Sequence, residues 1–387
     1  MPPPPRRPPP KQKGPDPLPG QRSRGALLGL AVGDALGAPM RGRNLLAPLF
    51  PQLADGMRRM PMGGKFKSRI PQDPMTANYE DFPEGIPENG ELPPPVVELR
   101  KGQVTDETHM ACCIAWSLKE VKSYNASDVV RRYRAWKPVA FDMSDPMREV
   151  LNEMDAGMPA LTSGRRVWIR GFRRSCTNSS LARTAPIGVF FAKDDAARLQ
   201  ASFDDSALTH YDPRCQLACV ALNEAIARAI TGGDKLQPSD LLIAAQKGLS
   251  IGAAALARSL SDYVEEVSFA KSLLWADLEA AQQQNPMLYG PELHLHRHHG
   301  HVRIAFRLAF WELLHAPSLE AALVDVANRG ADADAHGAIT GALLGAFYGE
   351  SAIPAEWKQL VLESMNTVRG PLWNLYHPRH LLALVQD

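Results

Sequence analysis

The chain has 387 residues, of which 45% are hydrophobic and 22% are charged, values that are ordinary for a globular enzyme. Its formal net charge is only +1, so it has no general positive field that would attract nucleic acid or an anionic membrane surface. The five cysteines include no CxxC pair, which argues against a zinc site or a disulfide framework. We therefore expect a soluble protein in a reducing, cytoplasmic compartment, with no nucleic acid and no membrane among its partners.

Residues 1–22 form a proline tract with interspersed arginine and lysine, MPPPPRRPPPKQKGPDPLPGQR. Proline lacks the backbone donor that helix and sheet require, which predicts an extended tail. Two roles stay open for this tail. It is either disordered, or it docks onto a partner that has an acidic or aromatic groove.

From Gly25 onward apolar residues recur every three to four positions, which predicts helices over most of the chain. The predicted helices are 24–38, 106–121, 127–136, 179–192, 213–231, 238–258, 302–315, 318–329 and 335–349. Residues 41–104 differ, because proline and glycine are frequent there and predict a long irregular excursion. The pattern shows no convincing strand and no interdomain linker, so we expect one all-α domain over residues 23–387.

Glycine recurs at every fourth position in two of the predicted helices. These positions are Gly25, Gly29, Gly33 and Gly37 in the first helix, and Gly337, Gly341, Gly345 and Gly349 in the second. Each interior glycine costs about 1 kcal/mol relative to alanine. Rows with this spacing form ridges that interdigitate between helices. We expect both helices to be central and closely packed, and their similar ridges make each a candidate neighbour of the other.

Acidic residues gather at two predicted helix starts. They are Thr105-Asp106-Glu107-Thr108 before one helix and Asp332-Ala333-Asp334 before the other. N-capping is one explanation, because such side chains accept from free backbone N–H groups. The alternative is a hard-cation site, because the two starts together offer more oxygens than capping needs. Asp34, in GDALG, is either a cleft residue or a helix-end acid.

Four blocks of sequence, in this order, resemble the ADP-ribosylglycohydrolase family. They are GALLGLAVGDALGAP at 25–39, LRKGQVTDETHMA at 99–111, NSSLARTAPIG at 178–188 with SALTHYDPRC at 206–215, and ANRGADADAHGAITGALLGAFYG at 327–349. The resemblance implies a compact, single-domain orthogonal bundle of helices with two divalent ions, Mg²⁺ or Mn²⁺, in a cleft. It also implies hydrolysis of the bond between ADP-ribose and a protein side chain, usually arginine in bacterial members.

The resemblance also assigns roles to residues of this chain. It implies metal ligands at Thr105, Asp106, Glu107, Asp332 and Asp334, and a catalytic part for Asp106, Glu107 and Asp334. The loop RSCTNSSLAR at 174–183 resembles the segment that wraps the distal ribose and diphosphate, with Ser175, Thr177 and Asn178 as candidates. His210 matches a histidine that faces the ligand, and a purely structural histidine is the alternative.

The chain departs from the family pattern in three places. Glu107 replaces an aspartate, Ala335 replaces a threonine, and Met40-Arg41-Gly42 stand where many members carry a glutamate. These changes bear on the second metal position, although water can replace a missing threonine oxygen and His336 is a further candidate.

Two functions follow from these observations. The first is a metal-dependent hydrolase that acts on an ADP-ribosylated protein. The alternative is an immunity protein that blocks an ADP-ribosyltransferase through residues 1–22 or the 41–104 excursion, with weak or no catalysis.

Overall fold

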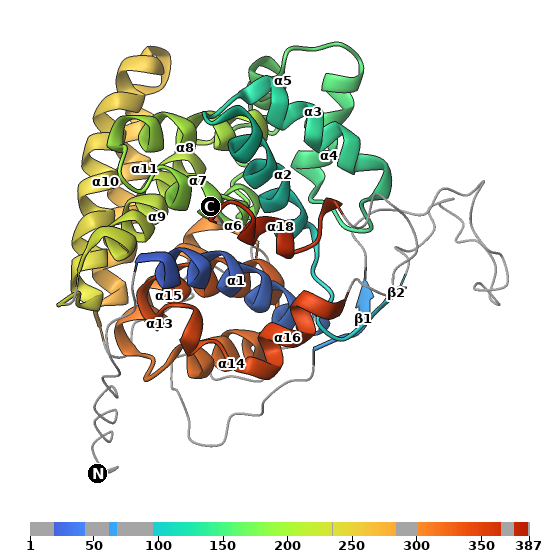
Figure 1. Cartoon of the computed structure of the whole chain (residues 1–387). Helices are drawn as coiled ribbons and strands as arrows, with labels where there is room; N and C mark the ends of the chain where they lie inside the picture. Colours follow the sequence, from blue (N-terminus) through green and yellow to red (C-terminus); the bar gives the residue numbers. More distant parts are fainter. Residues whose placement is uncertain are drawn as a thin grey trace, which may run out of the picture.

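The computed structural model describes residues 19–42, 62–67, 96–233, 235–283, 300–364 and 375–385 (Figure 1). Residues 1–18 of the predicted tail, and most of the excursion at 41–104, lie outside this described part. Within it the chain is almost entirely helical, which confirms the all-α prediction.

The first elements are α1 (Pro19–Gly37), the short 3-10 helix η1 (Ala38–Met40), and the strands β1 (Gly64–Lys67) and β2 (Val96–Leu99). They are followed by α2 (Asp106–Val121), α3 (Ala126–Trp136), η3 (Lys137–Val139), α4 (Asp145–Asp155), α5 (Ala160–Arg170), α6 (Ser179–Arg183), α7 (Ala185–Phe190) and α8 (Asp195–Thr209). The remaining elements are α9 (Pro213–Thr231), α10 (Pro238–Ser259), η4 (Ser261–Tyr263), α11 (Val264–Ala281), α13 (Val302–His315), α14 (Leu319–Arg329), α15 (Ala333–Tyr348), η5 (Glu350–Ala352), α16 (Ala355–Glu363) and α18 (Arg379–Leu382).

Helices α1 and α15 lie side by side at the centre of the fold and run antiparallel (Figure 1). A Cβ atom added to Gly29 would lie 2.0 Å from the carbonyl oxygen of Gly341, and one added to Gly341 would lie 2.0 Å from that of Gly29. The same reciprocal contact joins Gly33 to Gly337. The two glycine ridges therefore face each other, as the sequence predicts, and this close approach leaves no room for a side chain.

The other helices pack around this central pair. Helices α9, α13 and α14 contact α15, and α10 and α11 pack outside α9. Helix α10 is long and apolar enough to span a membrane by length and composition, but Leu241, Leu242, Leu249 and Leu256 bury its apolar face in the main core. A second apolar cluster lies among α2, α3, α4 and α5, where Tyr133 and Trp136 are fully buried. Helix α2 contributes side chains to both clusters and so joins them.

The prediction missed six of the described helices, α4, α5, α8, α11, α16 and α18. Two of the predicted helices also differ clearly in their bounds. Helix α1 begins at Pro19, within the predicted tail, and Arg22 is buried and donates to the carbonyl oxygen of Ala229 at 3.0 Å. The predicted helix 179–192 is two helices, α6 and α7, with the break at Thr184. Pro186 explains the break, because it has no N–H to donate to the carbonyl of residue 182.

The described part of the 41–104 excursion contains a short antiparallel ribbon. Strand β1 pairs with β2, with Gly64 opposite Leu99. Phe66 of this ribbon is buried against Ala38 of η1. The ribbon therefore covers the end of α1, beside the acidic residues described next.

Candidate active site

The ends of three helices meet beside the glycine contact. Gly37, at the end of α1, lies against the backbone of Ala333 and Asp334, at the start of α15. Asp34, one turn earlier on α1, accepts hydrogen bonds from the backbone N–H of Thr105 at 3.0 Å and from that of Thr108 at 3.2 Å. Asp34 thus caps α2 from a different helix, which fixes the start of α2 against the α1–α15 pair.

This junction carries six carboxylates that are at most 3% exposed. They are Asp34, Asp106, Glu107, Asp142, Asp332 and Asp334. Burial, followed by the charge of Glu107, raises the pKa of Asp34 well above its ordinary value. The Thr105 hydroxyl lies 2.7 Å from both Asp34 Oδ1 and Glu107 Oε2, so it connects these two carboxyl groups. Burying so many carboxylates together costs free energy unless positive charge lies among them. A bound cation would reduce this cost.

The described contacts support the capping explanation of the two acidic starts only in part. Neither Thr105 at α2 nor Asp332 at α15 makes a side-chain capping bond to its own helix there. Asp332 Oδ2 instead accepts from the side-chain amide of Asn178 at 2.8 Å. Asp334 Oδ1 does accept from the N–H of Ala335 at 3.0 Å, so capping accounts for one oxygen at the start of α15 but not for Asp332.

The predicted substrate loop lies directly beside Asp332. The backbone N–H of Asn178 donates to the carbonyl of Gly300 at 2.9 Å, and that of Val302 donates to the carbonyl of Cys176 at 3.0 Å. These bonds attach the loop to the start of α13. Asn178 is only 1% exposed and holds Asp332, whereas Ser175 and Thr177 are half-buried.

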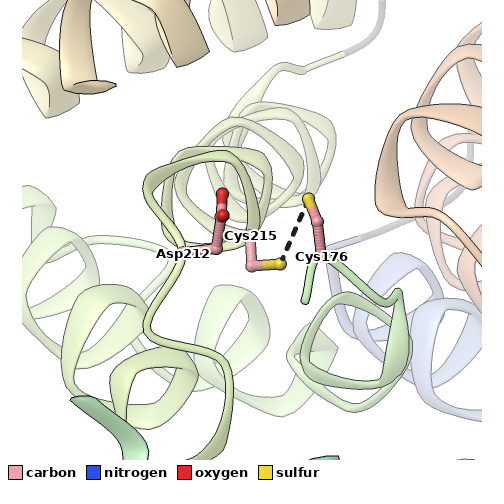
Figure 2. Close-up of side chains that lie close together, drawn as sticks. All are labelled: Cys176, Asp212 and Cys215. Carbon is pink, nitrogen blue, oxygen red and sulfur yellow. Dashed lines mark hydrogen bonds between the residues drawn. The ribbon is translucent and has the colours of Figure 1, made fainter. Parts of the chain in front are cut away.

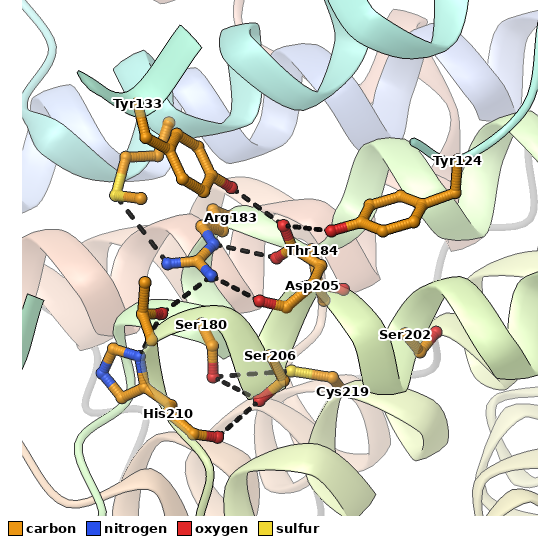
Figure 3. A network of polar contacts seen from close by, with 12 residues as sticks. Tyr124, Tyr133, Ser180, Arg183, Thr184, Ser202, Asp205, Ser206, His210 and Cys219 are labelled. Atoms are coloured by element: carbon orange, nitrogen blue, oxygen red, sulfur yellow. Dashed lines mark hydrogen bonds and ion pairs between the residues drawn. The ribbon is translucent and has the colours of Figure 1, made fainter. Parts of the chain in front are cut away.

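His210 ends a chain of hydrogen bonds that begins at a buried ion pair (Figure 3). Arg183 pairs with Asp205 at 2.9 Å and donates to the Thr209 hydroxyl at 2.9 Å. Thr209 Oγ1 lies 2.8 Å from His210 Nδ1, and His210 Nε2 lies 2.7 Å from Thr177 Oγ1. Every partner is satisfied when Thr209 donates to Nδ1 and Nε2–H donates to Thr177, which leaves the Thr177 proton to donate elsewhere.

His210 should make the fold sensitive to acid. Burial, followed by the charge of Arg183, lowers the pKa of His210 from 6.5 to about 3. The unfolded state therefore gains a proton that the native state does not, so stability is lost as the pH falls from about 6.5 toward 3, by up to about 1.4 kcal/mol per pH unit. Urea unfolding between pH 7 and pH 5 measures this slope. The His210→Gln variant should show a shallower slope, and an unchanged slope would contradict the assignment.

A second cluster of candidate ligands lies next to the loop (Figure 2). Ligand atoms of Cys176, Asp212 and Cys215 lie within 4.8 Å of one another, and the two sulfur atoms are 3.8 Å apart. The Asp212 carboxylate already accepts from Trp168 Nε1 at 2.9 Å and from Arg214 at 2.8 Å. Burial raises the pKa of the Cys215 thiol well above its ordinary value, which disfavours the thiolate that binds metal. This cluster fits a hard divalent cation less well than the acidic junction does.

The comparison with known proteins decides the family. The family model described as ADP-ribosylglycohydrolase matches residues 15–384. The chain belongs to the ADP-ribosylglycohydrolase family. This glycohydrolase is therefore a hydrolase of glycosidic bonds, as the four sequence blocks predicted.

Known relatives agree with this assignment. The glycohydrolase is similar to the ADP-ribosylarginine hydrolase Tri1 of Pseudomonas putida (strain GB-1), with 24% identity over 89% of this chain and 75% of that protein. It is also similar to the ADP-ribosylarginine hydrolase Tri1 of Serratia proteamaculans (strain 568), with 23% identity over 87% of this chain and 74% of that protein. A solved structure of an ADP-ribosylglycohydrolase-related protein complex shares the fold, with a TM-score of 0.57 and 22% identity over 95% of this chain and 99% of that one.

Two residues of the glycohydrolase junction had no role in the sequence prediction. Asp142, in the loop between η3 and α4, forms a close ion pair with Arg41. Arg41 follows η1, where the sequence departs from the family pattern. Asp142 has no local sequence signal, because its place in the junction depends on a contact with a residue 101 positions away.

Proposed function

We propose that this glycohydrolase cleaves the N-glycosidic bond between ADP-ribose and an arginine side chain of a modified protein, with the help of Mg²⁺ or Mn²⁺. The observation that carries the proposal is the junction of α1, α2 and α15, where buried carboxylates meet beside the loop at 174–178. The names of the two relatives support arginine as the modified residue. The five free cysteines, all buried, support a cytoplasmic location.

The residues at the start of α2 would hold the cation. Thr105 supplies a hydroxyl and Asp106 and Glu107 supply carboxylates, which are the oxygen ligands that hard cations prefer. A bound divalent ion would supply Lewis acidity and would lower the pKa of a water molecule bound to it toward neutral pH. Asp34 keeps this start in place through its bonds to the backbone of Thr105 and Thr108.

The remaining residues would orient the ligand and move a proton. Glu107 is the candidate base, because the Thr105 hydroxyl fixes the orientation of its Oε2 at 2.7 Å. In the tautomer in which His210 Nε2–H donates to Thr177, the Thr177 hydroxyl would donate its proton to a ribose or phosphate oxygen. A cavity of about 520 Å³ beside the loop is lined by Trp168, Arg173, Arg174 and Arg214 among others. Arg173 pairs with Glu266 and Arg214 pairs with Asp212, whereas Arg174 could contact an anionic group. Among the described residues, no acid of the junction lines this cavity.

The proposal predicts that activity depends on metal and on the acids of the junction. On a substrate with ADP-ribosylated arginine, release of ADP-ribose should require Mg²⁺ or Mn²⁺ and should stop in EDTA. Asp106→Ala, at the proposed cation site, should lower kcat/KM by more than about 100-fold, since even residues that only position metal ligands are worth about 10- to 100-fold. Glu265→Gln, an exposed change on α11, is the matched control and should leave the rate unchanged. Absence of turnover with every metal would exclude the proposed hydrolase.

The immunity alternative has its own test. Because α1 begins at Pro19, a chain without residues 2–18 keeps all described elements. Its hydrolysis should equal that of the full chain. If an inactive Asp106→Ala chain still inhibited an ADP-ribosyltransferase, and removal of residues 2–18 abolished that inhibition, then blocking rather than hydrolysis would be the function.

A further inference from the structure

Arg41 places a positive charge inside the acidic junction. Its Nη1 forms a close ion pair with Asp142 and lies 3.4 Å from Asp334 Oδ2, and its Nε lies 3.7 Å from Asp332 Oδ1. The side chain is 7% exposed and its guanidinium lies over the Phe66 ring, 5.0 Å from the ring centroid. Arg41 therefore belongs to the buried interior of the junction.

The backbone around Arg41 is fixed on both sides. The N–H of Arg41 donates to the Ala38 carbonyl at 3.3 Å, and the N–H of Gly42 donates to the Ala331 carbonyl at 2.7 Å. Gly42 has a φ of 68°, a conformation that favours glycine. These bonds fix the backbone of Arg41 next to the start of α15. The fold, and not a mobile surface side chain, therefore places the guanidinium there.

Each carboxylate oxygen at the start of α15 lies close to a donor or to the Arg41 guanidinium, and the two Arg41 contacts are ion-pair contacts rather than hydrogen bonds. Asp332 Oδ1 faces Arg41 Nε, and Asp332 Oδ2 accepts from Asn178 Nδ2 at 2.8 Å. Asp334 Oδ1 accepts from the N–H of Ala335 at 3.0 Å, and Asp334 Oδ2 faces Arg41 Nη1. Ala335 is fully buried and offers no side-chain oxygen. A divalent ion between Asp332 and Asp334 would lie against the guanidinium, which repels it, because Arg41 already contacts both carboxylates.

We propose that the Arg41 guanidinium takes the place of a divalent cation at Asp332 and Asp334, so that this glycohydrolase binds one ion, at Thr105–Glu107, instead of two. The inference rests on the proposed metal-dependent function and revises the two ions that the family resemblance implied. A guanidinium has the planar donors that suit two carboxylates, and it keeps its charge at every physiological pH. Asp332 and Asp334 then serve as partners of Arg41 and of the loop rather than as ligands of a metal.

Binding of Mn²⁺ to the metal-free full chain tests this inference directly. Titration followed by calorimetry and by the electron paramagnetic resonance signal of free Mn²⁺ should give one ion per chain. Arg41→Gln, which removes the charge, should bind two ions, whereas Arg41→Lys should still bind one. Arg131→Gln, at an exposed arginine of α3, is the control and should bind one. Asp106→Asn should weaken the remaining site by at least about 10-fold, as expected for loss of a ligand.

The outcomes separate this inference from the proposed function. Two ions on the unmodified chain, with hydrolysis intact, would overturn the single-ion inference and leave the hydrolase standing. No bound ion and no hydrolysis would overturn both. If Arg41→Gln fails to fold by circular dichroism, the stoichiometry of the unmodified chain and of Arg41→Lys still decides between one ion and two.

Discussion

Replacing Gly341 by alanine is expected to destabilise the protein by more than about 3 kcal/mol. A Cβ atom at this position would lie 2.0 Å from the carbonyl oxygen of Gly29, and 2.6 Å from its carbonyl carbon. These are backbone atoms in a buried helix, so no side chain can turn away to make room. Overpacking of a tight core usually costs about 1–3 kcal/mol, and here α1 and α15 must move apart along their whole contact.

The sign of this effect distinguishes the glycine ridge from an ordinary helix position. On an exposed helix, alanine is favoured over glycine by about 1 kcal/mol. Gly20→Ala is the matched control, because nothing lies within 4 Å of a Cβ at Gly20 in the first turn of α1. The urea midpoint should fall for Gly341→Ala and rise slightly for Gly20→Ala. A midpoint for Gly341→Ala at or above that of the unmodified chain would show that the helices do not approach as closely as the structure has them.

The contact between α1 and α15 also determines the geometry of the candidate active site. The glycine ridge ends at Gly37, whose added Cβ would lie 2.4 Å from the backbone nitrogen of Asp334. The spacing of α1 and α15 thus sets the distance between Asp34, which fixes α2, and the acids that begin α15. A variant that separates the helices should lose metal affinity together with stability.

Sequence patterns predicted the central pair and the strongly periodic helices because both depend on local periodicity. They missed helices such as α4, α5, α8 and α11. The predicted bounds of 106–121, 213–231 and 302–315 agree with α2, α9 and α13. Glycine at every fourth position in both helices predicted close packing, because a close backbone contact explains why side chains are absent from these positions. The acidic residues were identified for a similar reason, since each group is a short run in the sequence.

The rest of the site could not be predicted because it depends on contacts between distant segments. The place of Arg41 in the junction depends on the hydrogen bond from the Gly42 N–H to the Ala331 carbonyl, a contact that no local pattern predicts. Asn178 was a candidate for substrate binding, and only the fold shows its amide on Asp332, 154 positions away. Capping of α2 by Asp34 likewise requires two helices to meet. Periodicity within one segment carries no information about these pairs.

The second large effect is expected from Asp205→Asn, which leaves the charge of Arg183 without its carboxylate. Arg183 is fully buried, and its guanidinium donates to Asp205 Oδ2 at 2.9 Å and stacks 5.0 Å from the centre of the Tyr133 ring. Burial lowers the pKa of Arg183, but the charge and hydrogen bond of Asp205, together with Tyr133 and Tyr124, offset this and raise the pKa above its ordinary value. Loss of one partner from such a pair typically costs about 3–5 kcal/mol, because the remaining ion stays buried and uncompensated.

The neighbouring acid provides the control for this change. Asp204 lies one residue earlier, where it accepts from the Gln200 amide at 2.8 Å, and Asp204→Asn should shift stability by less than about 0.5 kcal/mol. Urea unfolding of both variants gives the comparison. Similar midpoints for the two would contradict the importance of the buried pair.

Asp205→Asn should also weaken binding of ADP-ribose, because Asp205 begins a chain of hydrogen bonds that ends at Thr177. Asp205 orients Arg183, and Arg183 donates to Thr209, which in turn orients His210 and the Thr177 hydroxyl. Removing both charges in Arg183→Met with Asp205→Asn should recover part of the lost stability, because no buried ion remains. It should not recover ADP-ribose affinity, because Thr209 still lacks its donor. Recovery of both together would mean that the ion pair contributes only stability and has no part in positioning Thr177.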